Sequence, residues 1–274
     1  MPELPEVETV VQGLLQGKII GKRIAAISIT YPQLVKQPDE FLKEVKGASV
    51  EHCYRRGKFI LFDLSCGKTL LVHLRMTGKL LLSEKTEKST AHIHAVFTFN
   101  DGSSMLYSDV RKFGRFYLVD DAVKYLSHLG IEMLADDFSF AEFCKKIMQS
   151  NRSLKTLLLD QKVIAGLGNI YVDEALFKAQ LHPKRKSCTL TKKELMTLAD
   201  AIQSVLQAAI QRGGSSLGKG LGNFLNSYGR SGENQHEFQA YQRTGLPCKV
   251  CSTKIERIIM GQRSTHFCPR CQTL

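Results

Sequence analysis

The apolar residues near the start of the chain follow the spacing of one helical face. They recur at i, i+3, i+4, i+7 and i+8, as Val7, Val10, Val11, Leu14 and Leu15, and this spacing is typical of an amphipathic helix. Pro5 suits the first turn of such a helix, because its fixed φ angle is already helical. We therefore expect a helix over about residues 5–16 that packs against the rest of the protein and holds the N-terminus of the chain at its first turn.

Between about residues 23 and 119 the pattern changes to short strand-like runs. Segments rich in Gly, Asp, Ser and Lys separate these runs, which read RIAAISITY, KFILFDL, TLLVHLRM, HIHAVFTF, MLYSDV and RFYLV. Many short strands with turn residues between them indicate a β-sandwich or a barrel-like domain.

After a transition at 120–137 the pattern becomes helical. The helical runs are AEFCKKIMQS, SLKTLLLDQ, IYVDEALFKAQ and KKELMTLADAIQSVLQAAIQR. The segment GGSSLGKGLGNFLNSYGRSG that follows holds seven glycines, so we expect a mobile loop there. The predicted fold is α+β, with a β-sandwich domain over 1–132, a helical domain over 133–236 and a C-terminal hairpin over 237–274.

Charge narrows the class of partner. The chain has 38 Lys and Arg against 26 Asp and Glu, a net charge of +12, and such an excess is typical of proteins that bind a polyanion. Ribosomal and membrane-surface proteins are basic too. No apolar run approaches the roughly 20 residues that span a bilayer, and the start lacks the layout of a secretory signal, so we expect an intracellular, cytoplasmic protein without a membrane partner.

Four of the eight cysteines form two close pairs near the C-terminus. The spacing Cys248-x2-Cys251, sixteen residues, Cys268-x2-Cys271 matches a closed, structural zinc site. A redox dithiol is the alternative, but it needs one pair beside a βαβ unit. Between the pairs, KIERIIM and STHF predict a hairpin with Arg263 near its tip, where a guanidinium can bind phosphate; a solvated turn charge is the plain alternative.

Four further segments have candidate chemistry. The Gly-rich turn before a helix at about Ile170 suits phosphate, with Asn169 assisting, or is a plain interhelical turn. The segments RMTGK and DVRKFGR place Met76 and Phe113 among cations, as wedges for a base turned out of a duplex or as core residues. At the terminus, Pro2 beside Glu3 suits amine nucleophilic catalysis once Met1 is removed, or caps a helix.

Taken together, these segments resemble one family, the formamidopyrimidine-DNA glycosylases. The resemblance spans nearly the whole chain in order and spacing. It rests on PELPEVET at the start, RRGK at 55–58, HLRMTGK at 73–79, DVRKFG at 109–114, GLGNIYVDEALF at 166–177, HP at 182–183 and the four cysteines.

The resemblance implies a fold, a chemistry and a set of roles. The fold is an N-terminal β-sandwich with an N-terminal helix, a helix-two-turn-helix domain and a zinc-finger hairpin, with DNA between the halves. Pro2, freed by loss of Met1, attacks C1′ of an oxidised purine nucleoside while Glu3 handles protons. Further catalytic roles fall to Lys58, near the lesion and its phosphate, and to Arg263. The residues placed at DNA are His73, Met76, His92, Arg111, Phe113, Lys155, Asn169, Tyr241 and Arg263, with Glu174 a neighbour of less definite role.

The chain also departs from the family pattern. The Gly-rich stretch at 217–230 is longer than the family loop that closes over the extruded base, which makes lesion preference the weakest inference from the resemblance. Gln242 stands where a glycine is common, and Ile131 and Met133 replace prolines.

The expected protein is a monomer that binds one structural Zn²⁺ and double-stranded DNA containing oxidised purines, with both glycosylase and AP lyase activity. The alternatives are an endonuclease VIII-like enzyme for oxidised pyrimidines and a DNA-binding protein without chemistry.

Overall fold

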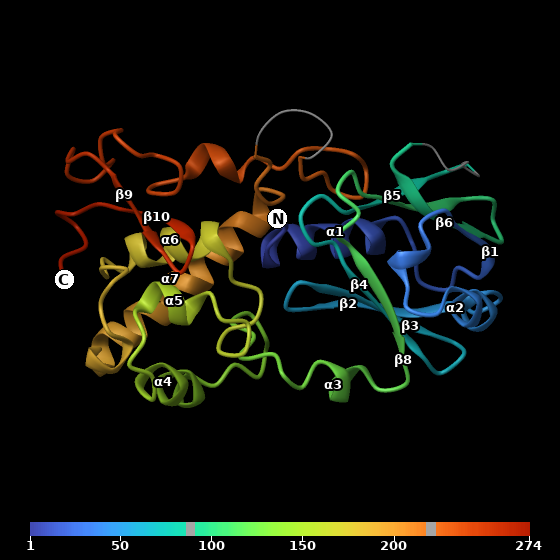
Figure 1. Cartoon of the computed structure of the whole chain (residues 1–274), viewed down its shortest axis with the longest axis horizontal. Coiled ribbons are helices and arrows are strands. Elements are labelled where there is room, and N and C mark those ends of the chain that lie inside the picture. The colour runs from blue at the N-terminus through green and yellow to red at the C-terminus, as the bar shows by residue number, and fades with distance from the viewer. Residues whose placement is uncertain (86–90, 218–222) are drawn as a thin grey trace. The chain divides into compact units, whose positions relative to one another are not determined.

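The computed structural model describes residues 1–85, 91–217 and 223–274 (Figure 1). Contacts within the chain group them into two compact units, one of Met1–Ser127 with Arg212–Gln235 and one of His128–Gln211 with His236–Leu274. Residues 218–222 of the predicted Gly-rich loop lie outside the described residues. The three-part division at 132/133 and 236/237 stays a prediction.

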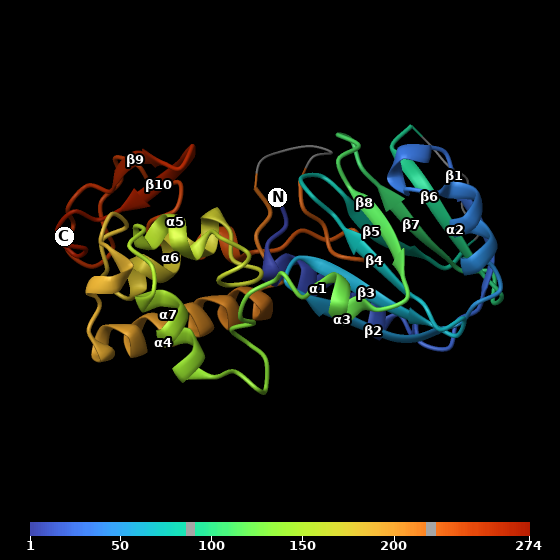
Figure 2. The ribbon, with the colours of Figure 1, turned by 60° about the horizontal axis from the view of Figure 1, so that its bottom comes forward.

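The first unit is the β-sandwich that the short apolar runs predict. Its two sheets are both antiparallel and four-stranded, with strand orders β1-β6-β7-β5 and β2-β3-β4-β8 (Figure 2). The strands are β1 Ile24–Ile29, β2 Val50–Arg56, β3 Phe59–Leu64, β4 Thr69–His73, β5 Lys79–Ser83, β6 Ile93–Phe99, β7 Ser104–Ser108 and β8 Arg115–Val119. The helices of this unit are α1 Leu4–Gln16, η1 Pro32–Leu34, α2 Pro38–Val45 and α3 Ala122–Tyr125.

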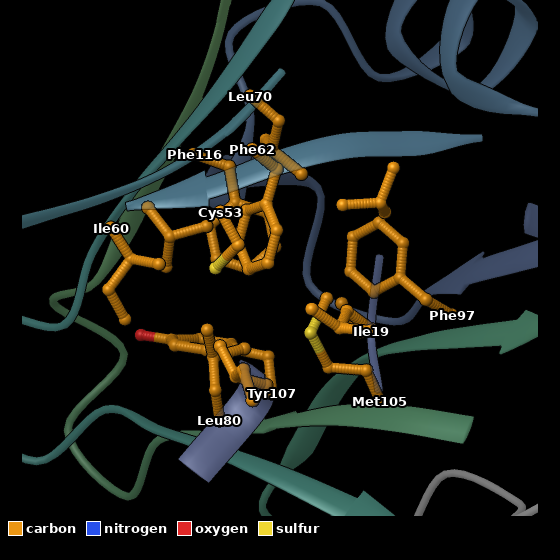
Figure 3. Packing of buried hydrophobic residues seen from close by; sticks show 14 of the residues in the cluster. Ile19, Cys53, Ile60, Phe62, Leu70, Leu80, Phe97, Met105, Tyr107 and Phe116 are labelled. Atoms are coloured by element: carbon orange, nitrogen blue, oxygen red, sulfur yellow. The ribbon is translucent and has the colours of Figure 1, made fainter. Parts of the chain in front are cut away.

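The core of this unit lies between the sheets. Figure 3 shows Phe62, Leu70 and Phe116 of one sheet facing Met105 and Tyr107 of the other, all nearly inaccessible to solvent. The predicted apolar stripe of α1 joins the same core through Val7, Val10, Val11 and Leu14. Leu15, the fifth residue of the predicted stripe, is instead 42% exposed. Burial of this stripe fixes the direction in which the first residues of the chain enter the sandwich.

The second unit is helical with a small hairpin. Its elements are α4 Phe140–Met148, α5 Leu154–Leu158, α6 Asn169–Lys178, η2 Ser187–Thr189, α7 Lys192–Gln211, η3 Asn234–Glu237 at the border with the first unit, β9 Glu256–Met260 and β10 Arg263–Phe267. Helix α6 packs against α7, α5 and strand β10, so it lies at the centre of the unit. Among the described residues, no helix is long and apolar enough to cross a membrane.

Candidate active site and nucleic-acid interface

The first residues of the chain are held by a pair of glutamates. Pro2 and Glu3 are buried, and Glu3 occupies the position that begins α1. The Glu6 carboxylate accepts the backbone N–H of Glu3 at 2.8 Å and that of Ser215 at 2.7 Å. Glu6 thereby fixes the terminus both to its own helix and to the segment that returns to this unit after α7.

Gly214 is required for this attachment. It has a φ of +77°, and a Cβ at this position would lie 3.0 Å from the Glu6 side chain. A side chain here would meet both an unfavourable backbone conformation and a steric conflict. The first residues of the Gly-rich segment therefore have a structural role, because they hold Glu6 near the N-terminus.

The turn that holds Lys58 is joined to α1. Arg55 at the end of β2 pairs with Glu8 of α1 at 2.9 Å and donates to the carbonyl of Gly57 at 3.1 Å. Lys58 follows directly and is only 7% exposed. The structure thus brings this lysine to the same side of the sandwich as the first turns of α1.

His73 lies close to Lys58 as a neutral ring. Its Nδ1 accepts the backbone N–H of Arg75 at 3.0 Å, and its ring packs edge-on against Phe59. Burial, with the positive charges of Arg75 and Lys58, lowers the pKa of His73 to about 3. The Nε2 atom therefore carries the remaining proton at neutral pH and can donate a hydrogen bond.

Asp109 joins the two loops that hold Met76, Arg111 and Phe113. Burial alone would raise the pKa of this fully buried carboxyl, but hydrogen bonds from Thr77, Gly114, Tyr107 and the Arg111 backbone lower it below its ordinary value. Gly114 allows the approach, because a Cβ there would collide with the Tyr107 hydroxyl. Sequence reasoning did not select Asp109, although its place at the head of DVRKFG was a signal.

The two expected wedge residues, Met76 and Phe113, are exposed at these loop tips, as is Arg111. Met76 is 41% and Phe113 46% exposed, and the Arg111 guanidinium lies 4.7 Å from the centre of the Phe113 ring. His92 adjoins the same loops, because its carbonyl accepts the Asp109 N–H at 2.9 Å. Met76 and Phe113 lie outside the buried core of the sandwich, and exposed large apolar side chains beside cations are typical of a binding surface.

The four predicted zinc ligands converge. Their Sγ atoms all lie within 4.8 Å of one another, with 3.9 Å between Cys248 and Cys271 and 3.4 Å between Cys251 and Cys268. A tetrahedral ion with Zn–S bonds of about 2.3 Å separates its sulfurs by about 3.8 Å. Backbone N–H groups of Val250 and Cys271 point at the sulfurs, as thiolate ligands require. The cluster fits one structural Zn²⁺.

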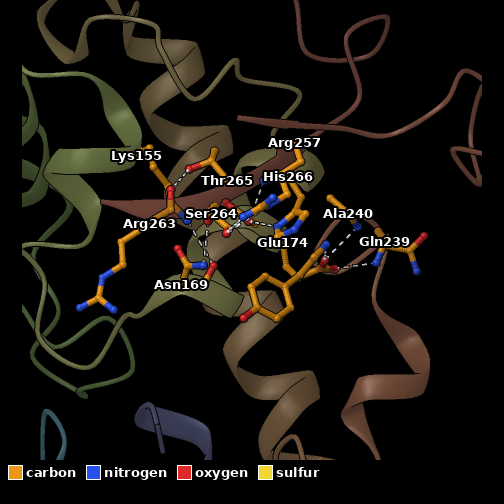
Figure 4. A network of polar contacts seen from close by, with 12 residues as sticks. Lys155, Asn169, Glu174, Gln239, Ala240, Arg257, Arg263, Ser264, Thr265 and His266 are labelled. Atoms are coloured by element: carbon orange, nitrogen blue, oxygen red, sulfur yellow. Dashed lines mark hydrogen bonds and ion pairs between the residues drawn. The ribbon is translucent and has the colours of Figure 1, made fainter. Parts of the chain in front are cut away.

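The hairpin between the cysteine pairs places Arg263 as predicted. Met260 pairs with Arg263 across a two-residue turn of Gly261 and Gln262, both with positive φ, the geometry of a tight hairpin turn. Figure 4 shows the Arg263 side chain extending away from the polar network behind it. Asn169, the first residue of α6, donates its side-chain N–H to the Ser264 carbonyl at 2.8 Å, so it lies next to the base of Arg263.

Lys155 differs from the other predicted DNA contacts because it is completely buried. Its Nζ lies 2.6 Å from the carboxylate of Asp173 and 3.2 Å from the carbonyl of Asn169. The other oxygen of Asp173 accepts the backbone N–H of His266 at 2.9 Å. In this arrangement the ammonium faces protein groups and is inaccessible to solvent.

Glu174 fixes the segment that carries Tyr241. Its carboxylate accepts the backbone N–H groups of Gln239, Ala240 and Tyr241 at 2.8 to 2.9 Å (Figure 4). The Tyr241 ring packs edge-on against that of His266, with the ring centres 5.1 Å apart. Glu174 therefore supports Tyr241 from the adjacent position on α6.

These features define the class of the protein: a basic, zinc-finger, nucleic-acid-processing protein with a β-sandwich unit and a helical unit. Residues 1–116 match the profile of the formamidopyrimidine-DNA glycosylase N-terminal domain, residues 129–220 that of the H2TH domain of the same enzymes, and residues 245–274 the zinc finger found in FPG and IleRS. The chain belongs to the formamidopyrimidine-DNA glycosylase family.

Known relatives cover the whole chain. The formamidopyrimidine-DNA glycosylase of Protochlamydia amoebophila is 43% identical over 99% of both chains. The complex of a Lactococcus lactis FPG point mutant with DNA containing Fapy-dG has a TM-score of 0.91 and 37% identity over all of both chains. The wild-type L. lactis FPG in complex with DNA containing an oxidised pyrimidine has a TM-score of 0.90 at the same identity and coverage.

Proposed function

We propose that this chain excises oxidised purines, such as 8-oxoguanine and formamidopyrimidines, from double-stranded DNA and then cleaves the strand, using the nitrogen of Pro2 as nucleophile. The observation that carries the proposal is the start of the chain, where Pro2 and Glu3 are buried and Glu6 fixes the backbone of Glu3 directly beside Pro2. Glu6 also accepts the backbone N–H of Ser215, a contact that a helix cap alone does not require. The family to which the chain belongs takes its name from the same lesion class.

The chemistry follows from the secondary amine. Once Met1 is removed, the Pro2 nitrogen is more easily deprotonated near neutral pH than a lysine. It forms a bond to C1′ as the bond from C1′ to the base breaks, and the proton lost from the Pro2 nitrogen goes to the leaving base. Glu3 then donates a proton to O4′ as the C1′–O4′ bond breaks, which opens the sugar ring and leaves an iminium between Pro2 and C1′. The resulting iminium accepts electrons and acidifies C2′, so both flanking phosphates leave by successive eliminations. One nucleophile thereby performs the glycosylase and the lyase steps.

Each unit supplies its own contacts to the nucleic acid. In the first unit, Lys58 and the donor face of His73 are the proposed partners of the phosphate near the lesion. In the second, Asn169, Arg263 and Tyr241 are the proposed backbone contacts. That the protein is a monomer and that it is cytoplasmic are part of the same proposal.

The side chain of Phe113 is expected to contribute to base excision from duplex DNA and not to cleavage of single-stranded DNA. Phe113→Ala removes an exposed side chain, so the melting temperature stays constant, but the space left by the extruded base loses part of its filling. We expect excision from duplex DNA to slow by about 10-fold to 100-fold, while cleavage of a single-stranded abasic substrate keeps its rate. Single-turnover kinetics on the two substrates measure this difference. Val123→Ala, at a position 84% exposed in the same unit, is the matched control, and equal losses on both substrates would contradict the filling role.

The test of the function is borohydride trapping on matched duplexes. An adduct should form with 8-oxoguanine opposite cytosine, and faster than with 5-hydroxycytosine. Faster trapping on the pyrimidine would favour the endonuclease VIII-like alternative, and tight binding without any adduct would favour a DNA-binding protein without chemistry.

A further inference from the structure

The open edge of β10 is occupied by side chains of α6. Strand β10 pairs with β9 along one edge, and a two-stranded hairpin of this size is marginally stable by itself. On the other edge, the Ser264 carbonyl accepts from Asn169 at 2.8 Å, and the His266 N–H donates to Asp173 at 2.9 Å. Residues of α6 therefore take the place of a third strand.

The spacing of helix and strand makes this attachment specific. Asn169 and Asp173 are one turn apart on a single face of α6, a rise of about 6 Å. Ser264 and His266 are two residues apart on β10, about 6.7 Å, and their carbonyl and N–H groups point to the same edge. A shift of β10 by one residue would break both hydrogen bonds, so this pair of contacts determines the register of β10 on α6.

A second contact holds the Asp173 carboxylate in place. Asp173 is fully buried, and Lys155 from α5, equally buried, lies 2.6 Å from its other carboxylate oxygen. Lys155 also donates to the Asn169 carbonyl at 3.2 Å, which attaches the start of α6 to the same ion pair. Three elements, α5, α6 and β10, thus meet at one carboxylate.

We propose that Asp173, with Lys155 as its counter-ion, is a positioning residue for phosphate binding: it fastens β10 to α6 so that Arg263 and Asn169 form one binding unit. This inference rests on the proposed function, because it takes Arg263 and Asn169 as phosphate contacts. Lys155 then acts from behind the interface and makes no contact with DNA itself.

A double-mutant cycle on the full-length, zinc-loaded protein tests the proposal, with a duplex containing a tetrahydrofuran abasic analogue as the probe. Arg263→Ala should raise Kd about 10-fold to 100-fold and reduce the slope of log Kd against log salt by about 1. Asp173→Asn should reduce the slope equally, and the double variant should bind no worse than Arg263→Ala alone. The proposal would be overturned if the effects of the two substitutions on Kd multiplied in the double variant and if Asp173→Asn left the salt slope unchanged.

A second variant covers the case in which Asp173→Asn fails to fold, because it leaves Lys155 buried without its partner. Asp173→Leu with Lys155→Met removes both charges and should fold with bound zinc, yet bind the probe as weakly as Arg263→Ala; wild-type affinity in this variant would overturn the proposal.

A control variant and the trapping assay separate failure of the positioning role from failure of the proposed function. Glu142→Gln, which removes an exposed pair with Lys146 on α4, should change neither Kd nor the slope. If the wild type formed no borohydride-trapped adduct with lesion DNA, the proposed function would be wrong. Normal trapping in the wild type with independent effects in the cycle would contradict the positioning role alone.

Discussion

Chains that keep Met1 are expected to bind abasic DNA and to form no borohydride-stable adduct. The nitrogen of Pro2 is then part of an amide, whose lone pair is delocalised into the carbonyl and is not nucleophilic. We expect a loss of strand cleavage of at least about 10³-fold, since the covalent step has no other nucleophile. Intact mass spectrometry of a partly processed preparation gives the fraction without Met1, and the trapped fraction should equal it.

A pair of tagged proteins makes the same test with a stronger block. An uncleaved tag at the N-terminus should abolish trapping, whereas the same tag after Leu274, which is 82% exposed, should leave it intact. Peptide mapping of the adduct should find the DNA on Pro2. An adduct on a lysine of a chain that retains Met1 would refute the proposed nucleophile.

Cys268→Ser is expected to release the zinc and to weaken DNA binding at least about 100-fold, with a smaller salt dependence. The reason is the size of the core around the cluster, which consists of Phe177, Ala240, Cys248, Ile255 and Cys268. So few apolar residues cannot hold a hairpin in one conformation, and metal binding supplies the missing free energy. Metal analysis and titration of the abasic duplex at several salt concentrations measure both effects.

The control for this prediction is a cysteine outside the cluster. Cys188 is an exposed free thiol in the same unit, and Cys188→Ser should retain one zinc and the wild-type affinity. If Cys268→Ser bound lesion DNA normally, the hairpin would have no part in phosphate binding. Proteolysis should find the β-sandwich intact in both variants.

The sequence predicts most of the fold where periodicity is clear. The α1 stripe, the six apolar strand runs and the helices α4 to α7 all appear, because their burial patterns repeat over whole elements. Strand β2 was not predicted, because a register shift between Val50 and His52 interrupts the alternation of apolar and polar residues along it. The sequence analysis also does not predict helix α2 and strand β5. Strand β5 begins at Lys79, the last residue of RMTGK, a segment interpreted only for its chemistry.

The site divides in the same way. The four cysteines converge as their spacing predicts, because ligands of one ion must lie close together wherever the intervening chain runs. Contacts between distant side chains leave no local pattern, and His266 lies 93 residues from the Asp173 that holds it. Lys155 is an example: the resemblance implies a position near DNA, which stays a prediction, and no sequence pattern indicates its ion pair with Asp173.

The carboxylate of Asp109 holds its loops through Thr77, Tyr107 and backbone N–H groups, and makes no use of the side chains of Met76, Arg111 or Phe113. The scaffold is therefore independent of the residues that it displays. Replacements at these three positions should change how the space left by an extruded base is filled without costing stability, so this pair of loops is a convenient place to redesign how the protein engages a duplex.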